Sequence, residues 1–115
     1  MKFQQRKHLY KVVKAIEKTI DITSNTRFYE QSLKIIHKEL LKIMSCLKRN
    51  SEEYEIINEV VQTLDDVIHE TQDIYHYSII DDKGEHKRTT DRKGHIIGIL
   101  EWALDYIVGN IEVEE

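Results

Sequence analysis

Residues 26–48 read TRFYEQSLKIIHKELLKIMSCLK, and this stretch decides the fold. Apolar residues recur in it every three or four positions, the spacing that places side chains on one face of an α-helix. The repeat is close to a heptad and continues through the whole stretch. We therefore predict a long amphipathic helix here. Its predicted buried positions are Tyr29, Leu33, Ile36, Leu40, Ile43 or Met44, and Leu47.

Two more helices adjoin this one in the sequence. A first helix is predicted over residues 3–22, where apolar residues follow the same spacing. Ser24 or Asn25 can cap the start of the helix at 26–48. A third helix is predicted to run unbroken over residues 51–74, because its apolar positions keep the helical period and no glycine or proline interrupts it.

The last third of the chain contains a fourth helix and the least regular segment. The fourth helix is predicted over residues 90–110. Before it, aromatic or aliphatic side chains alternate with polar ones over residues 75–79, and residues 82–84 read Asp-Lys-Gly. This pattern is compatible with a short β-hairpin, and a long loop fits the same residues.

The helix lengths and the short turns between them define the topology. Long helices joined by turns of a few residues must run antiparallel to their neighbours. We therefore predict an all-α fold, an antiparallel up-and-down four-helix bundle, with either a short β-hairpin or a loop between helices three and four. Residues 1–110 form this single domain, and residues 111–115 are expected to be a frayed acidic tail.

Composition indicates a reducing compartment. Cys46 is the single cysteine, which excludes a disulfide framework. The charged N-terminus is not followed by the apolar segment of a signal peptide. The most apolar window, residues 95–108, contains Glu101 and Asp105 and is too short to cross a bilayer. We therefore expect a cytoplasmic protein that does not associate with membranes.

Charge is segregated along the sequence, although the net charge is only −4. Residues 1–50 carry twelve Lys and Arg against four Asp and Glu. Residues 51–82 carry ten Asp and Glu and no Lys or Arg. Such separation is typical of proteins that hold a partner, or their own copies, by electrostatic attraction.

Helical geometry turns this segregation into two predicted partner-binding surfaces. On the first two helices the lysines project opposite the apolar seam, and on the third helix the acidic residues fall within an arc of about 60°. The predicted basic face comprises Lys7, Lys11, Lys14, Lys18, Lys34, Lys38 and Lys42. The predicted acidic ridge comprises Glu52, Glu55, Glu59, Asp66, Glu70 and Asp73.

The fourth helix carries more apolar surface than one bundle contact needs. Its apolar residues cover about 240° of the circumference, whereas packing in a bundle requires little more than about 100°. Tryptophan and tyrosine are enriched at the centres of interfaces. We therefore predict self-association, as a homodimer, through Ile99, Trp102 and Tyr106, and Gly98 permits a close approach there.

One motif has an enzymatic counterpart. Glu52-Glu-Tyr-Glu55 followed by Glu70-Thr-Gln-Asp73 resembles the ExxE…ExxD signature of the all-α, MazG-like nucleotide pyrophosphohydrolases. The resemblance covers this motif only, and it implies carboxylates that hold Mg²⁺ against the phosphates of a nucleotide. On an unbroken helix, however, Glu55 and Glu70 lie about 22 Å apart, too far to share an octahedral ion.

A second group has the residue types of a metal site. On the predicted third helix His69, Asp73 and His76 share one flank, and His37 could add a fourth ligand. Histidines at the edge of a bundle are also common without a metal. We therefore predict no catalytic residues, no metal ligands and no cofactor.

These observations favour a small cytosolic regulatory or adaptor protein that acts by protein–protein interaction and self-association. The first alternative is a nucleic-acid-binding accessory protein that uses the basic face of helices one and two. The acidic third helix is excluded from reading DNA, because phosphates would repel it. The second alternative is metal-dependent, MazG-like nucleotide hydrolysis.

Overall fold

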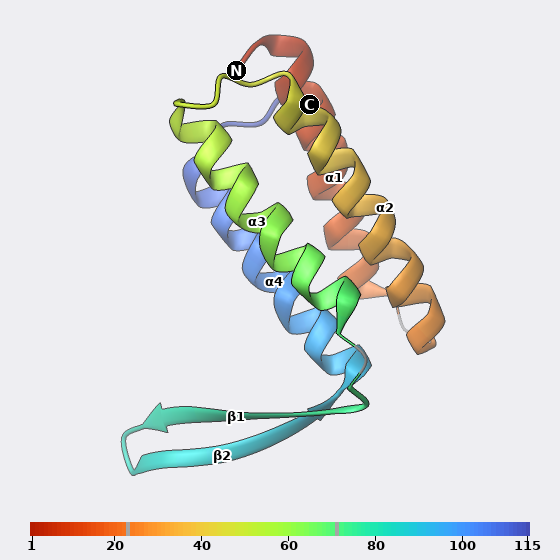
Figure 1. The fold of residues 1–115 in the computed structure, drawn as a ribbon, viewed down its shortest axis with the longest axis vertical. Coiled ribbons are helices and arrows are strands. Elements are labelled where there is room, and N and C mark those ends of the chain that lie inside the picture. The colour runs from red at the N-terminus through yellow and green to blue at the C-terminus, as the bar shows by residue number, and fades with distance from the viewer. Residues whose placement is uncertain (23, 71) are drawn as a thin grey trace.

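The computed structural model describes residues 1–22, 24–70 and 72–115, apart from the side chain of Asp81. Within these residues the chain forms four α-helices and two β-strands (Figure 1). In chain order they are α1 (Phe3–Asp21), α2 (Thr26–Ser45), α3 (Glu52–His69), β1 (Ile74–Asp81), β2 (Gly84–Asp91) and α4 (Arg92–Asn110).

The helices pack as the predicted up-and-down bundle. α1 packs against α2 and α4, α3 also packs against α2 and α4, and α2 touches α4 across the bundle. Figure 1 shows α2 and α3 in front of α1 and α4, with both chain ends at one end of the bundle and the strands at the other. The fold expected from the helical periods is therefore confirmed.

The core consists of the apolar seams of all four helices. Leu33, Leu64 and Leu100 are fully buried at its centre, on α2, α3 and α4. Short polar side chains begin three of the helices, because each accepts a hydrogen bond from a backbone N–H that the helix cannot satisfy. Asn25, Ser51 and Asp91 cap α2, α3 and α4 in this way.

The third helix is shorter than the sequence predicts. α3 ends at His69, and its cap residue Glu70 has an extended backbone. The prediction of an unbroken helix over residues 51–74 was wrong, because strand β1 begins at Ile74. Alternating Tyr and Ile side chains favour a strand, and residues 84–91 supply the pairing partner that a helical period does not reveal.

The two strands form a β-hairpin, one of the two structures, hairpin or loop, that the sequence allows between the third and fourth helices. β1 and β2 pair in antiparallel register from Ile74 opposite Asp91 to Asp81 opposite Gly84. Gly84 has a φ of +111°, which side-chain-bearing residues rarely adopt, so the tight turn depends on glycine. In Figure 1 the hairpin projects from the bundle beside α3 and α4, across the direction of the helices.

The C-terminal residues lie against the bundle, although the sequence predicts a frayed tail. Ile111 is 5% exposed and belongs to the core, and Val113 packs against it. The backbone N–H of Glu114 donates to the carbonyl of Arg6 on α1. Two apolar residues and one backbone hydrogen bond therefore hold this acidic segment beside the start of α1.

Among the described residues, no helix has the length and apolar character to cross a membrane.

The core packing makes a direct stability prediction. Leu64→Ala should lower the free energy of unfolding by about 2–5 kcal/mol, because it opens a cavity between packed helices. Ile80→Ala is the control, since Ile80 is 84% exposed on the hairpin and its truncation should change stability by less than about 0.5 kcal/mol. Urea unfolding followed by circular dichroism measures both, and equal losses would contradict the assignment of the core.

Candidate interaction surface at the hairpin and α4

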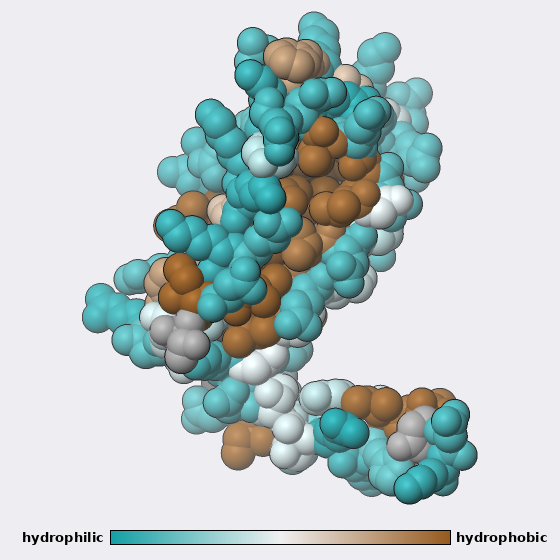
Figure 2. Space-filling view, turned by 180° about the vertical axis from the view of Figure 1, so that it is seen from behind, coloured by the Kyte–Doolittle hydropathy of each residue, from teal (hydrophilic) through white to brown (hydrophobic). Residues whose placement is uncertain are grey.

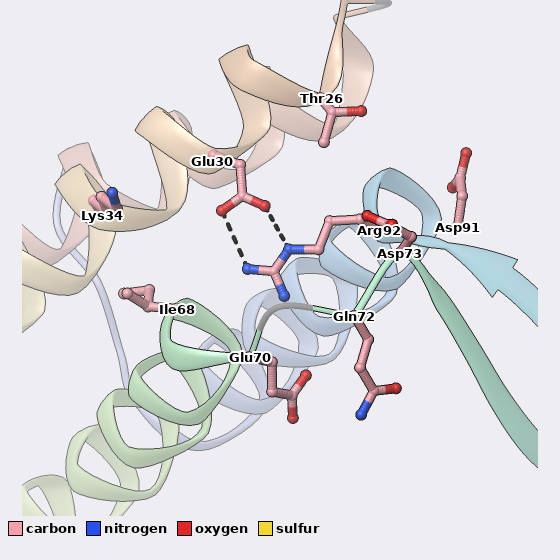
Figure 3. Close-up of a pocket in the computed structure, with 9 residues that line it drawn as sticks. All are labelled: Thr26, Glu30, Lys34, Ile68, Glu70, Gln72, Asp73, Asp91 and Arg92. Carbon is pink, nitrogen blue, oxygen red and sulfur yellow. Dashed lines mark hydrogen bonds and ion pairs between the residues drawn. The ribbon is translucent and has the colours of Figure 1, made fainter.

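Arg92 joins the hairpin to the bundle. It is the first residue of α4, and its side chain points between α2 and α3 toward Glu30 (Figure 3). Its Nε and Nη2 donate to the two carboxylate oxygens of Glu30, and Nη1 donates to the hydroxyl of Tyr75 on β1 at 2.6 Å. Nη2 also donates to the backbone carbonyl of Val67 at 2.7 Å, near the C-terminal end of α3. One side chain therefore ties together α2, α3, β1 and α4.

The hollow beside Arg92 has a polar lining, but the Arg92 guanidinium is already hydrogen-bonded to groups of the chain itself. The hollow has a volume of about 620 Å³, and Lys34, Glu70 and Asp73 are among its lining residues (Figure 3). The hydrogen bond from Arg92 keeps the pKa of Glu30 below its usual range, so this pair is ionised at neutral pH. Four of the five N–H donors of an arginine are thus used within the chain. This geometry suits a structural tie better than the binding of an anionic ligand.

Tyr75 and His95 form the second attachment of the hairpin. Their rings stack with centroids 3.9 Å apart, and of the described hairpin side chains Tyr75 alone is buried. Burial lowers the pKa of His95, the Glu70 carboxylate opposes this shift, and the Arg92 guanidinium adds to it. The imidazole is therefore held neutral against the tyrosine ring.

Beyond this stack the hairpin and α4 diverge and leave a largely apolar hollow of about 320 Å³. Tyr77 lines it from the hairpin, and Gly98 and Ile99 line it from α4. Strand alternation and register place Tyr77 and Ile79 on the same face as Arg88, the cross-strand partner of Tyr77. We call these three residues the outer hairpin face. Tyr77 is 45% and Ile79 37% exposed.

The two glycines of α4 near the hairpin have different surroundings. A Cβ atom at Gly94 would lie 2.1 Å from the hydroxyl oxygen of Thr90, so the close passage of β2 explains this glycine. At Gly98 a Cβ atom would meet none of the described atoms within 4 Å. A glycine inside a helix costs about 0.5–1 kcal/mol relative to alanine. Packing within the described chain gives no reason for that cost at Gly98.

The residues predicted for self-association lie together on α4. Ile99, Trp102 and Tyr106 are each partly buried, the rings of Trp102 and Tyr106 stack, and the Tyr106 hydroxyl donates to Glu59 of α3 at 2.6 Å. With Gly98, one turn before Trp102, we call them the hairpin-side surface of α4. Acidic residues border it: Glu55 and Glu59 on α3, and Glu101 and Asp105 on α4.

α4 is also apolar on its other side. Ile97, Leu104 and Val108 follow helical spacing on the flank away from Tyr106, and Val108 is 52% exposed. Because Tyr106 lies beside α3, this flank faces α1, and we call it the α1-side surface of α4. Figure 2 shows the side of the bundle formed by α1 and α4, where apolar side chains gather in a strip between hydrophilic flanks.

The predicted basic face is exposed, and part of its charge is neutralised locally. All seven lysines lie on the exposed sides of α1 and α2. Lys14 pairs with Glu17 at 3.1 Å, and Lys42 pairs with Glu39 at 3.1 Å. Glu39 also pairs with His8. The field of this face is therefore weaker than a count of its lysines implies.

The predicted acidic ridge is shorter than expected. Glu52, Glu55, Glu59 and Asp66 are exposed on α3, as predicted. Glu70 and Asp73 lie beyond the end of the helix, and both line the hollow beside Arg92 instead. Their placement on the ridge was wrong for the same reason that the predicted length of α3 was wrong.

The two candidate metal patterns are not assembled. The pair Glu52 and Glu55 begins α3, whereas Glu70 and Asp73 follow its other end, so the MazG-like motif is split by the whole helix. His69 ends α3 and His76 lies on β1, so the predicted shared helical flank does not exist. Instead, the Nε2 atom of His37 lies 3.6 Å from the Oδ1 atom of Asp65 on α3. The described residues contain no group of three or more His, Cys, Asp or Glu side chains that could hold a metal ion.

Two parts of this region were not predicted from the sequence. Arg92 carries no local signal, because its partners lie 17 to 62 residues away in the chain. The outer hairpin face was given no role, because residues 75–79 were equally compatible with a hairpin and with a loop. Its signal was the alternation of Tyr75, Tyr77 and Ile79, which predicts a one-sided strand.

Comparisons with known proteins give no further guide. No protein-family model, no curated protein and no solved structure matches this chain. The function proposed for the chain is therefore inferred from the surfaces described above.

The Arg92 junction predicts a specific loss when the fork of the guanidinium is removed. Arg92→Lys keeps the charge but cannot bond Glu30, Tyr75 and Val67 together, so stability should fall by about 1–3 kcal/mol. Hydrogen exchange measured by NMR should show faster exchange of the β1 and β2 amides than of the α2 core. Arg27→Lys, an exposed change on α2, is the matched control. Unchanged hairpin protection in Arg92→Lys would contradict this role.

The lowered pKa of His95 predicts an acid-sensitive hairpin. As pH falls below about 6.5, an unfolded histidine binds a proton before the folded one does, so protonation favours unfolding. The free energy of unfolding should therefore decrease as pH falls from about 6.5 through the folded pKa of His95. His95→Phe keeps a ring against Tyr75 and should reduce that decrease. Urea titrations of both proteins at several pH values test this, and identical pH dependence would contradict it.

Proposed function

We propose that this chain is a regulatory or adaptor protein that acts by protein–protein interaction and self-associates through α4. The observation that carries the proposal is the uneven burial of this helix. Ile96, Leu100, Ala103 and Ile107 fill the core, while Ile99, Trp102 and Tyr106 stay partly exposed. A helix with apolar side chains on most sides can bury them only if it is packed against other elements on most sides.

The character of the hairpin-side surface supports a protein partner. Stacked Trp102 and Tyr106 provide large, rigid apolar area, and such residues dominate the binding energy of interfaces. Acidic residues border them, as polar rims border interface centres. The MazG-like carboxylates lie at opposite ends of α3, which supports a role in binding over nucleotide hydrolysis.

Nucleic-acid binding through the basic face is the second candidate. The exposure of all seven lysines on α1 and α2 favours it. The ion pairs of Lys14 and Lys42 with glutamates weigh against it. Retention on immobilised DNA that falls steeply as salt rises would support this candidate, because each lysine–phosphate contact releases a counterion. Absence of retention at low salt would end it.

The proposal predicts a weakened dimer when the centre of the surface is truncated. Trp102→Ala should raise the dimer dissociation constant at least tenfold, since interface tryptophans typically contribute about 2 kcal/mol or more. Val108→Ala is the matched control on the α1-side surface and should leave association unchanged. Sedimentation equilibrium over a wide concentration range measures both. A wild-type chain that stays monomeric throughout would refute the proposed self-association.

A further inference from the structure

We infer that the hairpin is an exchanged arm: in a two-fold dimer the outer hairpin face of each copy lies on the hairpin-side surface of α4 in the other copy. This inference rests on the proposed self-association and names the segment that completes it. Its occupant is a second copy of this chain.

The hairpin itself requires such a contact. A two-stranded hairpin is only marginally stable in water unless another element covers one face. Tyr75 at its base packs on His95, but Tyr77 and Ile79 further out remain exposed on the same face. The apolar contact of this face thus stops halfway along the arm.

The outer hairpin face does not pack against the hairpin-side surface of α4 in its own chain. Tyr77 and Ile99 line opposite walls of the hollow of about 320 Å³, so the two apolar surfaces of one chain face each other without closing. The stack of Tyr75 on His95 and the bonds of Arg92 fix this divergence. Figure 1 shows the hairpin projecting away from the bundle beside α3 and α4, so another chain can approach the hollow from outside.

Gly98 marks the place where the entering chain would come closest to α4. Its absent side chain serves no contact among the described residues, and it lies in the wall of the hollow. A strand that packs on a helix approaches most closely where the helix has no side chain. The position of Gly98 beside Ile99 and one turn from Trp102 therefore fits a docked hairpin.

The charges of the two surfaces are complementary. Arg88 lies at the middle of the outer hairpin face, opposite Tyr77. The hairpin-side surface of α4 is bordered by Glu55 and Glu59 on one side and by Glu101 and Asp105 on the other. An apolar face with a central arginine matches an apolar strip with acidic edges. Because one chain carries both surfaces, two copies form two identical contacts and the assembly closes.

A mixing experiment with full-length chains tests the exchange. Ile79→Glu places a charge on the outer hairpin face, and Gly98→Gln adds bulk to α4 where the monomer has room for it. Each variant alone should raise the dimer dissociation constant tenfold or more in sedimentation equilibrium. An equimolar mixture should recover dimers of intermediate affinity, since a mixed dimer has one contact made entirely of wild-type surfaces.

Two matched controls define the geometry. Ile80→Glu alters the neighbouring, more exposed residue on the opposite face of β1, and Val108→Gln alters an exposed residue on the α1-side surface of α4. Both should dimerise like the wild type, and circular dichroism should show all four variants folded.

The outcomes separate this inference from the proposed function. A wild-type dimer that Ile79→Glu leaves intact, or that mixing does not restore, would overturn the exchange while keeping self-association. An equal loss in Ile80→Glu would also overturn it, because the opposite face or a strand edge would then form the contact. A wild-type monomer at all concentrations would overturn both.

Discussion

The bonds of the Arg92 side chain determine where the hairpin leaves the bundle. The guanidinium satisfies a carbonyl near the end of α3, the carboxylate of Glu30 on α2 and the hydroxyl of Tyr75 on β1. These groups come from elements that meet at one end of the bundle, and the helix that begins at Arg92 continues through its core. The divergence of hairpin and α4, and the apolar hollow between them, follow from this junction.

The segregation of charge along the chain has a different meaning once α3 is known to end at His69. The acidic residues divide into two groups with separate surroundings. Glu55 and Glu59 stay on the exposed side of α3 and border the apolar surface of α4, whereas Glu70 turns toward His95. The acidic segment thus serves a rim of the proposed interface and a junction within the chain, rather than one continuous ridge.

The periodic parts of the sequence predicted the fold well, and the parts that depend on distant contacts did not follow from it. The seam of α2 was predicted because burial repeats with the helical turn, and Leu33, Ile36 and Leu40 are buried as expected. The end of α3 depends on strand pairing and on Arg92, which are far away in sequence. The surplus apolar surface that includes Ile99, Trp102 and Tyr106 is visible in a helical projection, whereas the sequence left a hairpin and a loop equally open over the residues before α4.

In the proposed dimer, α4 and the hairpin form one surface that a second copy completes. Isotope-filtered NMR on a mixture of labelled and unlabelled chains measures this contact directly, because it detects only signals between copies. An exchanged hairpin should give cross-peaks between the Ile79 methyl groups of one chain and the Trp102 ring of the other. Cross-peaks that instead join hairpin to hairpin, or the Val108 methyl groups to the other chain, would contradict it.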